Sequence, residues 1–255
     1  DDNSCPIPVP YSIAITKQLL EALQFLHEKC GMLHLDIKAE NIIFVSRQLK
    51  KFRSGSIVLP STAAVRLIDF NSSVIGTSHE HFEACTVGYR PPENILGGRV
   101  SSAADVFSLG AIFVEMLTGI CPSGTFHDTE EDMFLNLMKI QRMPYSQEML
   151  QPAKQMTIRS VNSSIRNIVR QESLDGSSRT ECNLRVSFSD HALRRSNGVK
   201  MAIRWKKITD SKEGAVLQDL ALKMLHGSPN RRITVSEALA HQIFQIPLHG
   251  VGISP

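Results

Sequence analysis

Residues 103–117 constrain the fold most, because this stretch is apolar on nearly every side of a helix. A helix that is apolar all round is buried on all sides, so we expect it within the domain rather than on its surface. Gly119 is placed to end it. The chain has 255 residues, 42% of them hydrophobic, which is enough to enclose such a helix in one large domain.

Two further helices are predicted near the ends of the chain. Apolar residues recur at steps of four and three across residues 15–33, which indicates an amphipathic helix running to about Lys29. Gly31 is placed to stop that helix. Thr234 and Glu237 have the spacing of a capping box, which predicts the start of the final helix.

Short apolar runs at residues 42–45 and 65–68 predict a strand and its returning partner. Residues 46–63 are basic and then Ser/Pro-rich, so we expect a loop between the two strands. Residues 130–142 predict another helix. Residues 154–207 contain twelve Lys/Arg against four Asp/Glu and are only weakly periodic, which is typical of a basic, partly disordered insert.

Composition argues against several classes of function. The formal net charge of +3 is far from the dense positive field of a dedicated nucleic-acid binder. The five cysteines are an odd number and form no CxxC pair, which argues against a disulfide framework and a zinc site. The most apolar stretch, residues 106–120, is too short to span a membrane and contains Glu115. We therefore expect no membrane partner and no direct nucleic-acid binding.

The polar motif at residues 34–41 reads H-L-D-I-K-A-E-N. Asp36, Lys38 and Asn41 lie on one loop between a helix and a strand. Asp69 ends the partner strand, so all four side chains can face the same point. Phosphoryl transfer needs a carboxylate near the acceptor hydroxyl, a cation on the migrating phosphoryl group, and oxygen ligands for Mg²⁺. This spacing supplies each of those groups.

Together with D-F-N at residues 69–71, the motif resembles the catalytic loop H-R-D-L-K-P-E-N and the D-F-G turn of eukaryotic protein kinases. The resemblance implies that Asp36 accepts or orients the proton of the substrate hydroxyl. It implies that Lys38 neutralises the γ-phosphate of ATP, and that Asn41 and Asp69 hold Mg²⁺.

Three further stretches extend the resemblance. Residues 86–93, T-V-G-Y-R-P-P-E, are similar to the end of a kinase activation segment, and residues 105–110 to the start of the buried helix F. Residues 229–241 are similar to the end of the domain. In the family, the Asp at the start of helix F anchors the catalytic-loop backbone, and the late Arg pairs with a buried Glu. The resemblance thereby gives scaffold or activation-segment roles to His34, Thr86, Tyr89, Arg90, Glu93, Asp105 and Arg232.

Within the CMGC group of kinases, the chain looks most like the LAMMER (CLK) kinases. The lengthened region before Ala64, the His-Glu-His cluster at residues 79–81 and the Tyr-Arg pair at residues 89–90 carry this likeness. Residues 130–144 echo the LAMMER signature only loosely, and Met143-Pro144 is equally similar to the pre-mRNA-processing kinases. The chain also resembles the related DYRK-type kinases of this group.

Three positions depart from the family pattern. Leu35 stands where many kinases have an Arg that clasps a phosphorylated residue, so the protein should not depend on that clasp. Asn71 replaces the Gly of D-F-G, and Asn tolerates left-handed backbone angles, so we expect the turn to survive. Val87 replaces an Arg that CMGC kinases usually carry.

The chain contains no G-x-G-x-x-G after a strand and no V-A-I-K-like strand lysine. We therefore expect a protein-kinase-like fold limited to the C-terminal lobe, mainly α with a small β hairpin pair, and with the N-terminal β lobe absent. The expected division is an N-terminal stub at residues 1–12, a lobe at residues 13–246 that includes the insert, and a tail at residues 247–255.

The resemblance implies a serine/threonine or dual-specificity kinase that uses ATP and Mg²⁺. Its partners would be the missing lobe and protein substrates, of the Ser/Arg-rich splicing-factor type if the LAMMER likeness holds, in the nucleus or the cytoplasm. The alternative is a pseudokinase or scaffold module that binds partners without transferring phosphate, because the ATP-gripping motifs are missing. A nucleic-acid module that uses the basic insert is a third alternative, with no recognition motif to support it.

Overall fold

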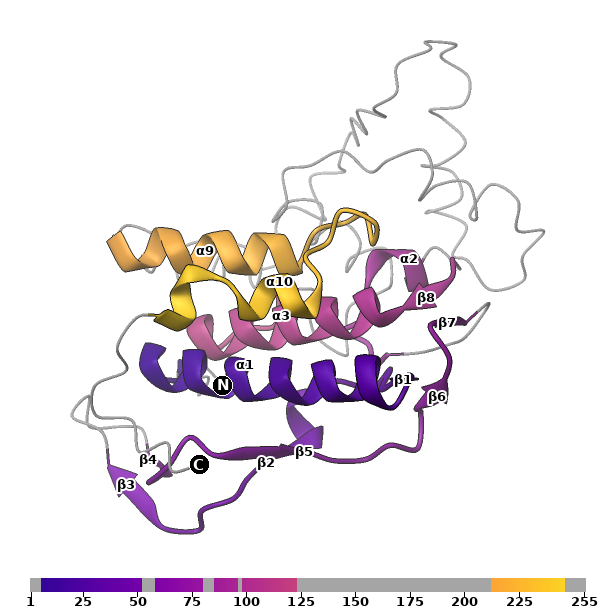
Figure 1. Ribbon diagram of the computed structural model, residues 1–255. Helices are drawn as coiled ribbons and strands as arrows, with labels where there is room; N and C mark the ends of the chain where they lie inside the picture. The colour runs from indigo at the N-terminus through magenta and orange to yellow at the C-terminus, as the bar shows by residue number, and fades with distance from the viewer. Residues whose placement is uncertain (1–5, 52–57, 80–84, 96–97, 123–211, 246–255) are drawn as a thin grey trace, which may run out of the picture.

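Four helices dominate the computed structural model, which describes residues 6–51, 58–79, 85–95, 98–122 and 212–245. These helices are α1 (Val9–Gln24), α3 (Ser102–Thr118), α9 (Lys212–Met224) and α10 (Val235–Leu239). Figure 1 shows α3 between α1 on one side and α9 on the other. The predicted helix at residues 130–142 and the basic insert at residues 154–207 lie outside the described residues.

Helix α3 is the buried central helix that the sequence predicts. The side chain of Ser101 caps its start by accepting a hydrogen bond from the backbone N–H of Ala103 at 3.3 Å. Gly119 ends it in the left-handed conformation, with φ of 72°, where a residue without a Cβ is favoured. All but three residues between these ends are buried, so both the helix and its end at Gly119 are confirmed.

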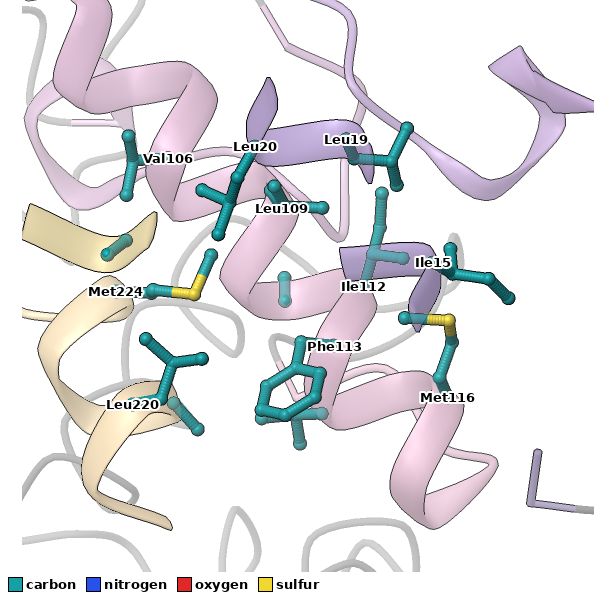
Figure 2. Packing of buried hydrophobic residues seen from close by; sticks show 14 of the residues in the cluster. Ile15, Leu19, Leu20, Val106, Leu109, Ile112, Phe113, Met116, Leu220 and Met224 are labelled. Carbon is teal, nitrogen blue, oxygen red and sulfur yellow. The ribbon is translucent and has the colours of Figure 1, made fainter. Parts of the chain in front are cut away.

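The main core forms where three helices meet (Figure 2). Leu19 and Leu20 of α1 pack on one side of α3, and Leu220 and Met224 of α9 pack on the other. Phe113 of α3 lies among them and is fully buried. Because α3 has apolar neighbours on both sides, its apolar surface is removed from water almost completely.

Close approach of α3 and α9 depends on Gly110. A Cβ added at this position would lie 2.8 Å from the Cβ of Met224 and 3.3 Å from its carbonyl carbon. We expect Gly110→Ala to lower the free energy of unfolding by about 1–3 kcal/mol through overpacking, although Ala is the better helix former. Urea unfolding followed by circular dichroism measures this change. A stability equal to or above wild type would show that the two helices can separate without cost.

Helix α1 begins at Val9, within the segment expected to be a stub, and continues into a π-helical turn, Phe25–Lys29. The backbone N–H of Cys30 closes this turn on the carbonyl of Phe25 at 3.1 Å. Gly31 follows with φ of 58°. The predicted end near Lys29 and the stop at Gly31 are therefore confirmed, whereas the π geometry of the last turn was not predicted.

Every sheet in the described residues is an antiparallel pair of short strands. The pairs are β1 (Met32–Leu33) with β6 (Val74–Ile75), β2 (Ile42–Phe44) with β5 (Val65–Leu67), β3 (Leu49–Lys51) with β4 (Val58–Pro60), and β7 (Ser78–His79) with β8 (Val100–Ser101). The β2–β5 pair confirms the predicted strand and its returning partner.

Residues 46–63 are more than the loop that the sequence predicts, because β3 and β4 form a hairpin within them. The strand β3 reads L-K-K, which has no apolar alternation to reveal it in the sequence, and every one of its residues is exposed. Leu59 of β4 packs against the main core and attaches the hairpin to the domain.

Short helical segments complete the described fold. They are η2 (Ala39–Asn41), α2 (Pro92–Ile95) and η3 (Gln242–Gln245). The capping box at α10 is confirmed: the backbone N–H of Glu237 donates to Thr234 at 3.2 Å, and that of Thr234 donates to Glu237 at 2.8 Å. Among the residues that the structure describes, no helix is long and apolar enough to cross a membrane.

Candidate active site

The loop between β1 and β2 gathers three of the predicted site residues. Lys38 Nζ lies 2.8 Å from Asp36 Oδ2, and Asn41 Nδ2 donates to the same oxygen at 3.1 Å. Asn41 Nδ2 also donates to the backbone carbonyl of Asp36 at 2.8 Å, which closes the loop on itself. These contacts hold the carboxylate, the ammonium group and the amide on one side of the loop.

Thr86 adds the activation segment to this network. Its hydroxyl donates to Asp36 Oδ1 at 2.6 Å and accepts a hydrogen bond from Lys38 Nζ at 3.2 Å. Both carboxylate oxygens of Asp36 therefore have donors. A substrate hydroxyl that reaches Asp36 has to approach beside Thr86 and Lys38.

Asp36 and Lys38 stabilise each other's charged forms. Burial disfavours the charged carboxylate of Asp36, but hydrogen bonds from Lys38, Thr86 and Asn41 outweigh burial and hold its pKa below the ordinary value. The hydrogen bond to Asp36 raises the pKa of Lys38. At neutral pH the site therefore contains a carboxylate able to accept a proton or orient a hydroxyl, and a cation beside it.

Asp69 follows β5 and is placed by a backbone contact to the same loop. The N–H of Ile68 donates to the carbonyl of Asn41 at 2.9 Å, so Asp69 comes directly after a residue bonded to Asn41. Asp69 is exposed and has φ of 64°, and its Oδ1 accepts the N–H of Asn71 at 3.3 Å. Its charge is one of the influences that raise the pKa of Lys38.

The left-handed residue of this turn is Asp69, so the turn does not use the tolerance of Asn71 for left-handed angles. Asn71 is absent from the described non-glycine residues with positive φ, which are Leu35, Asp69 and Cys85. Asp is among the few residue types that enter this region at small cost, because its short side chain can bond the local backbone. The bond from the N–H of Asn71 to Asp69 Oδ1 is such a contact.

Asn41 and Asp69 have the donor chemistry of a Mg²⁺ site. The amide nitrogen of Asn41 is directed to Asp36 by two hydrogen bonds, which leaves its amide oxygen as the atom that can ligate a cation. Asp69 contributes an exposed carboxylate. Hard divalent cations such as Mg²⁺ prefer oxygen ligands of these two kinds, so the residues fit the ion.

His34 is completely buried and has bonds at both ring nitrogens. Nδ1 accepts the N–H of Asp36 at 3.2 Å, and Nε2 lies 3.2 Å from the carbonyl of Ile68. The ring also packs against Phe70, with centroids 5.0 Å apart. Burial lowers its pKa, so the imidazole is neutral and links the catalytic loop to the strand before Asp69.

Asp105 at the start of α3 anchors the loop backbone. Its Oδ2 accepts the N–H of His34 at 2.9 Å, and its Oδ1 accepts the N–H of Leu35 at 2.8 Å. His27 Nε2 lies 2.8 Å from Oδ2 and completes the carboxylate's contacts. Sequence reasoning missed His27. The available signal was its place four residues after Leu23, where a polar residue continues a buried apolar stripe.

The remaining activation-segment residues bind α3 and the segment itself. Tyr89 donates its hydroxyl to Glu115 at 2.7 Å, and the carbonyl of Tyr89 accepts the hydroxyl of Ser108 at 2.8 Å. Burial raises the pKa of Glu115 and also that of Tyr89. Arg90 Nε donates to the carbonyl of Cys85 at 3.1 Å. Glu115 was missed as a partner, although it is the one acid inside the apolar run at residues 106–120.

Arg232 and Glu93 form the ion pair that the resemblance implies. Two guanidinium nitrogens of Arg232 contact the two carboxylate oxygens of Glu93 at 2.7 and 2.8 Å. Arg232 also donates to the carbonyls of His226, Gly227 and Ala103. Both residues are buried, at 4% exposure each, so this pair joins α2 to the segment before α10 inside the protein.

Comparison with known proteins places the chain in a family. The family described as "Protein kinase domain" matches residues 4–244, so the chain belongs to the protein kinases. The match covers nearly the whole chain and does not support restricting it to a C-terminal lobe. A solved structure titled "Crystal structure of PF14_0431, kinase domain" shares the fold with a TM-score of 0.67 at 19% identity, covering 95% of this chain and 67% of that one.

The curated relatives include LAMMER-type kinases. The chain is 30% identical to the dual specificity protein kinase lkh1 of Schizosaccharomyces pombe, over 97% of this chain and 34% of that protein. It is 29% identical to the dual specificity protein kinase CLK2 of Homo sapiens, over 96% and 45%, and 27% identical to the serine/threonine-protein kinase AFC2 of Arabidopsis thaliana, over 95% and 55%. The chain thus spans about a third to just over half of the length of these relatives.

Proposed function

We propose that this chain carries the phosphoryl-transfer site of a serine/threonine or dual-specificity protein kinase of the LAMMER type. The observation that supports the proposal most strongly is the network in which Asp36 is bonded to Lys38, Thr86 and Asn41. The network supplies an ionised carboxylate and a neighbouring cation on a loop that Asp105 anchors. The dual-specificity part rests on the names of relatives such as lkh1 and CLK2.

In this proposal Asp36 orients the attacking hydroxyl of a protein substrate and takes up its proton as the new P–O bond forms. Lys38 neutralises charge on the γ-phosphoryl group of ATP as its bond to the leaving oxygen breaks. Asn41 and Asp69 would hold Mg²⁺, which offsets negative charge on the phosphates when bound. Thr86 keeps Asp36 facing the position of the acceptor.

The limitation of the chain to a C-terminal lobe, with a division at residues 1–12, 13–246 and 247–255, belongs to the proposal, although α1 already begins at Val9. Its support is that no glycine-rich phosphate loop or strand lysine occurs in the 255 residues. Ser/Arg-rich protein substrates and a nuclear or cytoplasmic location are proposed on the LAMMER likeness alone.

The missing glycine-rich loop and strand lysine also support a second candidate, a pseudokinase that binds partners without transferring phosphate. Mg-ATP binding by the full-length protein bears on both candidates. We expect saturating Mg-ATP to raise the melting temperature, because a ligand at 100 times its Kd stabilises the native state by about 2.7 kcal/mol. Differential scanning fluorimetry with and without EDTA measures the shift.

Asp69→Asn is the matched variant, because it removes the proposed Mg²⁺ ligand's charge at an exposed position. This variant should keep its basal melting temperature and lose most of the shift. A full-length protein that shows no shift at any Mg-ATP concentration would favour the pseudokinase instead.

A further inference from the structure

A small apolar cluster lies beside the candidate active site, separate from the main core. We call it the Leu35 cluster. Its members come from the catalytic loop, the activation segment, three short strands and α3: Leu33, Leu35, Val74, Cys85, Val100 and Ala104. All of them are buried except Val74, which is partly buried. The cluster therefore joins elements that are far apart in the sequence at one point behind the loop.

The backbone is unusual at the two members that share a backbone hydrogen bond. Leu35 has φ of 61° and Cys85 has φ of 66°, a region that residues with a Cβ rarely enter. The N–H of Cys85 donates to the carbonyl of Leu35 at 2.8 Å. A strained backbone of this kind persists only where the surroundings specify it, and here burial of both side chains does so.

The neighbouring residues carry the chemistry. Asp36 follows Leu35, Thr86 follows Cys85, and the Thr86 hydroxyl donates to Asp36 at 2.6 Å. Two hydrogen bonds thus link the same two segments at consecutive positions. One joins the backbones of residues 35 and 85, and the other joins the side chains of residues 36 and 86. A shift of Cys85 would move Thr86 away from Asp36.

We propose that Leu35 and Cys85 are positioning residues, which hold Thr86 against Asp36 through the Leu35 cluster and so set the place of the acceptor hydroxyl without any charged ligand. Leu35 brings an apolar side chain, completely buried, to the position that carries an Arg in many kinases. The link between loop and activation segment therefore consists of apolar packing and one backbone hydrogen bond.

The test compares Leu35→Ala, Leu35→Met and Val100→Ala in the full-length protein, with Leu220→Ala as the control. Leu220 is also completely buried, but it lies in the main core on α9 (Figure 2). We expect Leu35→Ala to lower kcat by about tenfold to a hundredfold, since small misplacements of reacting groups have effects of this size. KM for ATP should stay within about twofold, Leu35→Met should recover most of kcat, and Val100→Ala should show a smaller loss of kcat.

Leu220→Ala should lower the melting temperature but not kcat below that temperature. If Leu35→Ala or Val100→Ala lowers the melting temperature with kcat unchanged, the positioning role is overturned. Should Leu35→Ala fail to fold, Val100→Ala decides alone, because it leaves both strained backbone positions untouched.

The kinetic arm rests on the proposed phosphoryl transfer, so a second readout separates the two ideas. Hydrogen exchange at the Cys85 amide reports its bond to Leu35 directly, whether or not phosphate is transferred. We expect faster exchange in Leu35→Ala and Val100→Ala than in Leu220→Ala. Wild-type protein without kinase activity would overturn the proposed function, while unchanged Cys85 exchange in both cluster variants would overturn the positioning role.

Discussion

Replacing Asp36 with Asn should lower the rate of phosphate transfer by about 10²–10⁴-fold, the range in which general acid–base groups contribute. Asn keeps the shape of the side chain and can still accept the hydrogen bond from Thr86. It has no negative charge to attract Lys38, and its amide does not take up a proton. Quench-flow measurement of a single turnover separates this step from substrate binding and product release.

ATP binding should survive the Asp36→Asn change, because the proposed Mg²⁺ ligands are Asn41 and Asp69. Glu21→Gln is the matched control, a loss of one carboxylate at an exposed position on α1, paired only loosely with Lys17 at 4.0 Å. Full transfer activity in Asp36→Asn would contradict the mechanism, because the carboxylate proposed to take up the proton of the substrate hydroxyl is then missing.

The largest loss of stability is expected from Arg232→Met. The variant leaves the Glu93 carboxylate buried without its cation, and breaking a buried pair in this way typically costs about 3–5 kcal/mol. The backbone carbonyls of His226, Ala103 and Gly227 also lose the hydrogen bonds that Arg232 donates to them. Urea unfolding of wild type and variant gives the difference in free energy.

Two companion variants make the Arg232 result interpretable. Lys223→Met removes an exposed ion pair with Asp219 at 2.7 Å, which should cost less than about 1 kcal/mol. The double variant Glu93→Leu with Arg232→Met should regain part of the loss, because no charge is then left buried. A cost for Arg232→Met no larger than that for Lys223→Met would show that the pair contributes little.

Several elements were predictable because local chemistry specifies them. Gly119 ends α3 in a conformation that favours glycine, and Thr234 with Glu237 begins α10 through two reciprocal hydrogen bonds. The site residues Asp36, Lys38 and Asn41 lie within six positions on one loop, so their meeting needs little tertiary information. Their spacing alone was informative.

Other features depend on contacts between distant segments and left no local signal. The β3–β4 hairpin is attached through Leu59, while its other strand is exposed throughout. The left-handed angles at Leu35 and Cys85 are set by what surrounds these residues, since neither Leu nor Cys favours such angles. Tertiary packing therefore decides these positions.

The decisive measurement is phosphate transfer by the full-length wild-type protein. It follows labelled γ-phosphate from Mg-ATP to a protein substrate. We predict that label appears on serine or threonine hydroxyls, that EDTA abolishes it, and that Asp36→Asn reduces it at least about a hundredfold. A protein that binds Mg-ATP and transfers no label to any substrate or to itself would contradict the proposed function of the Asp36 network.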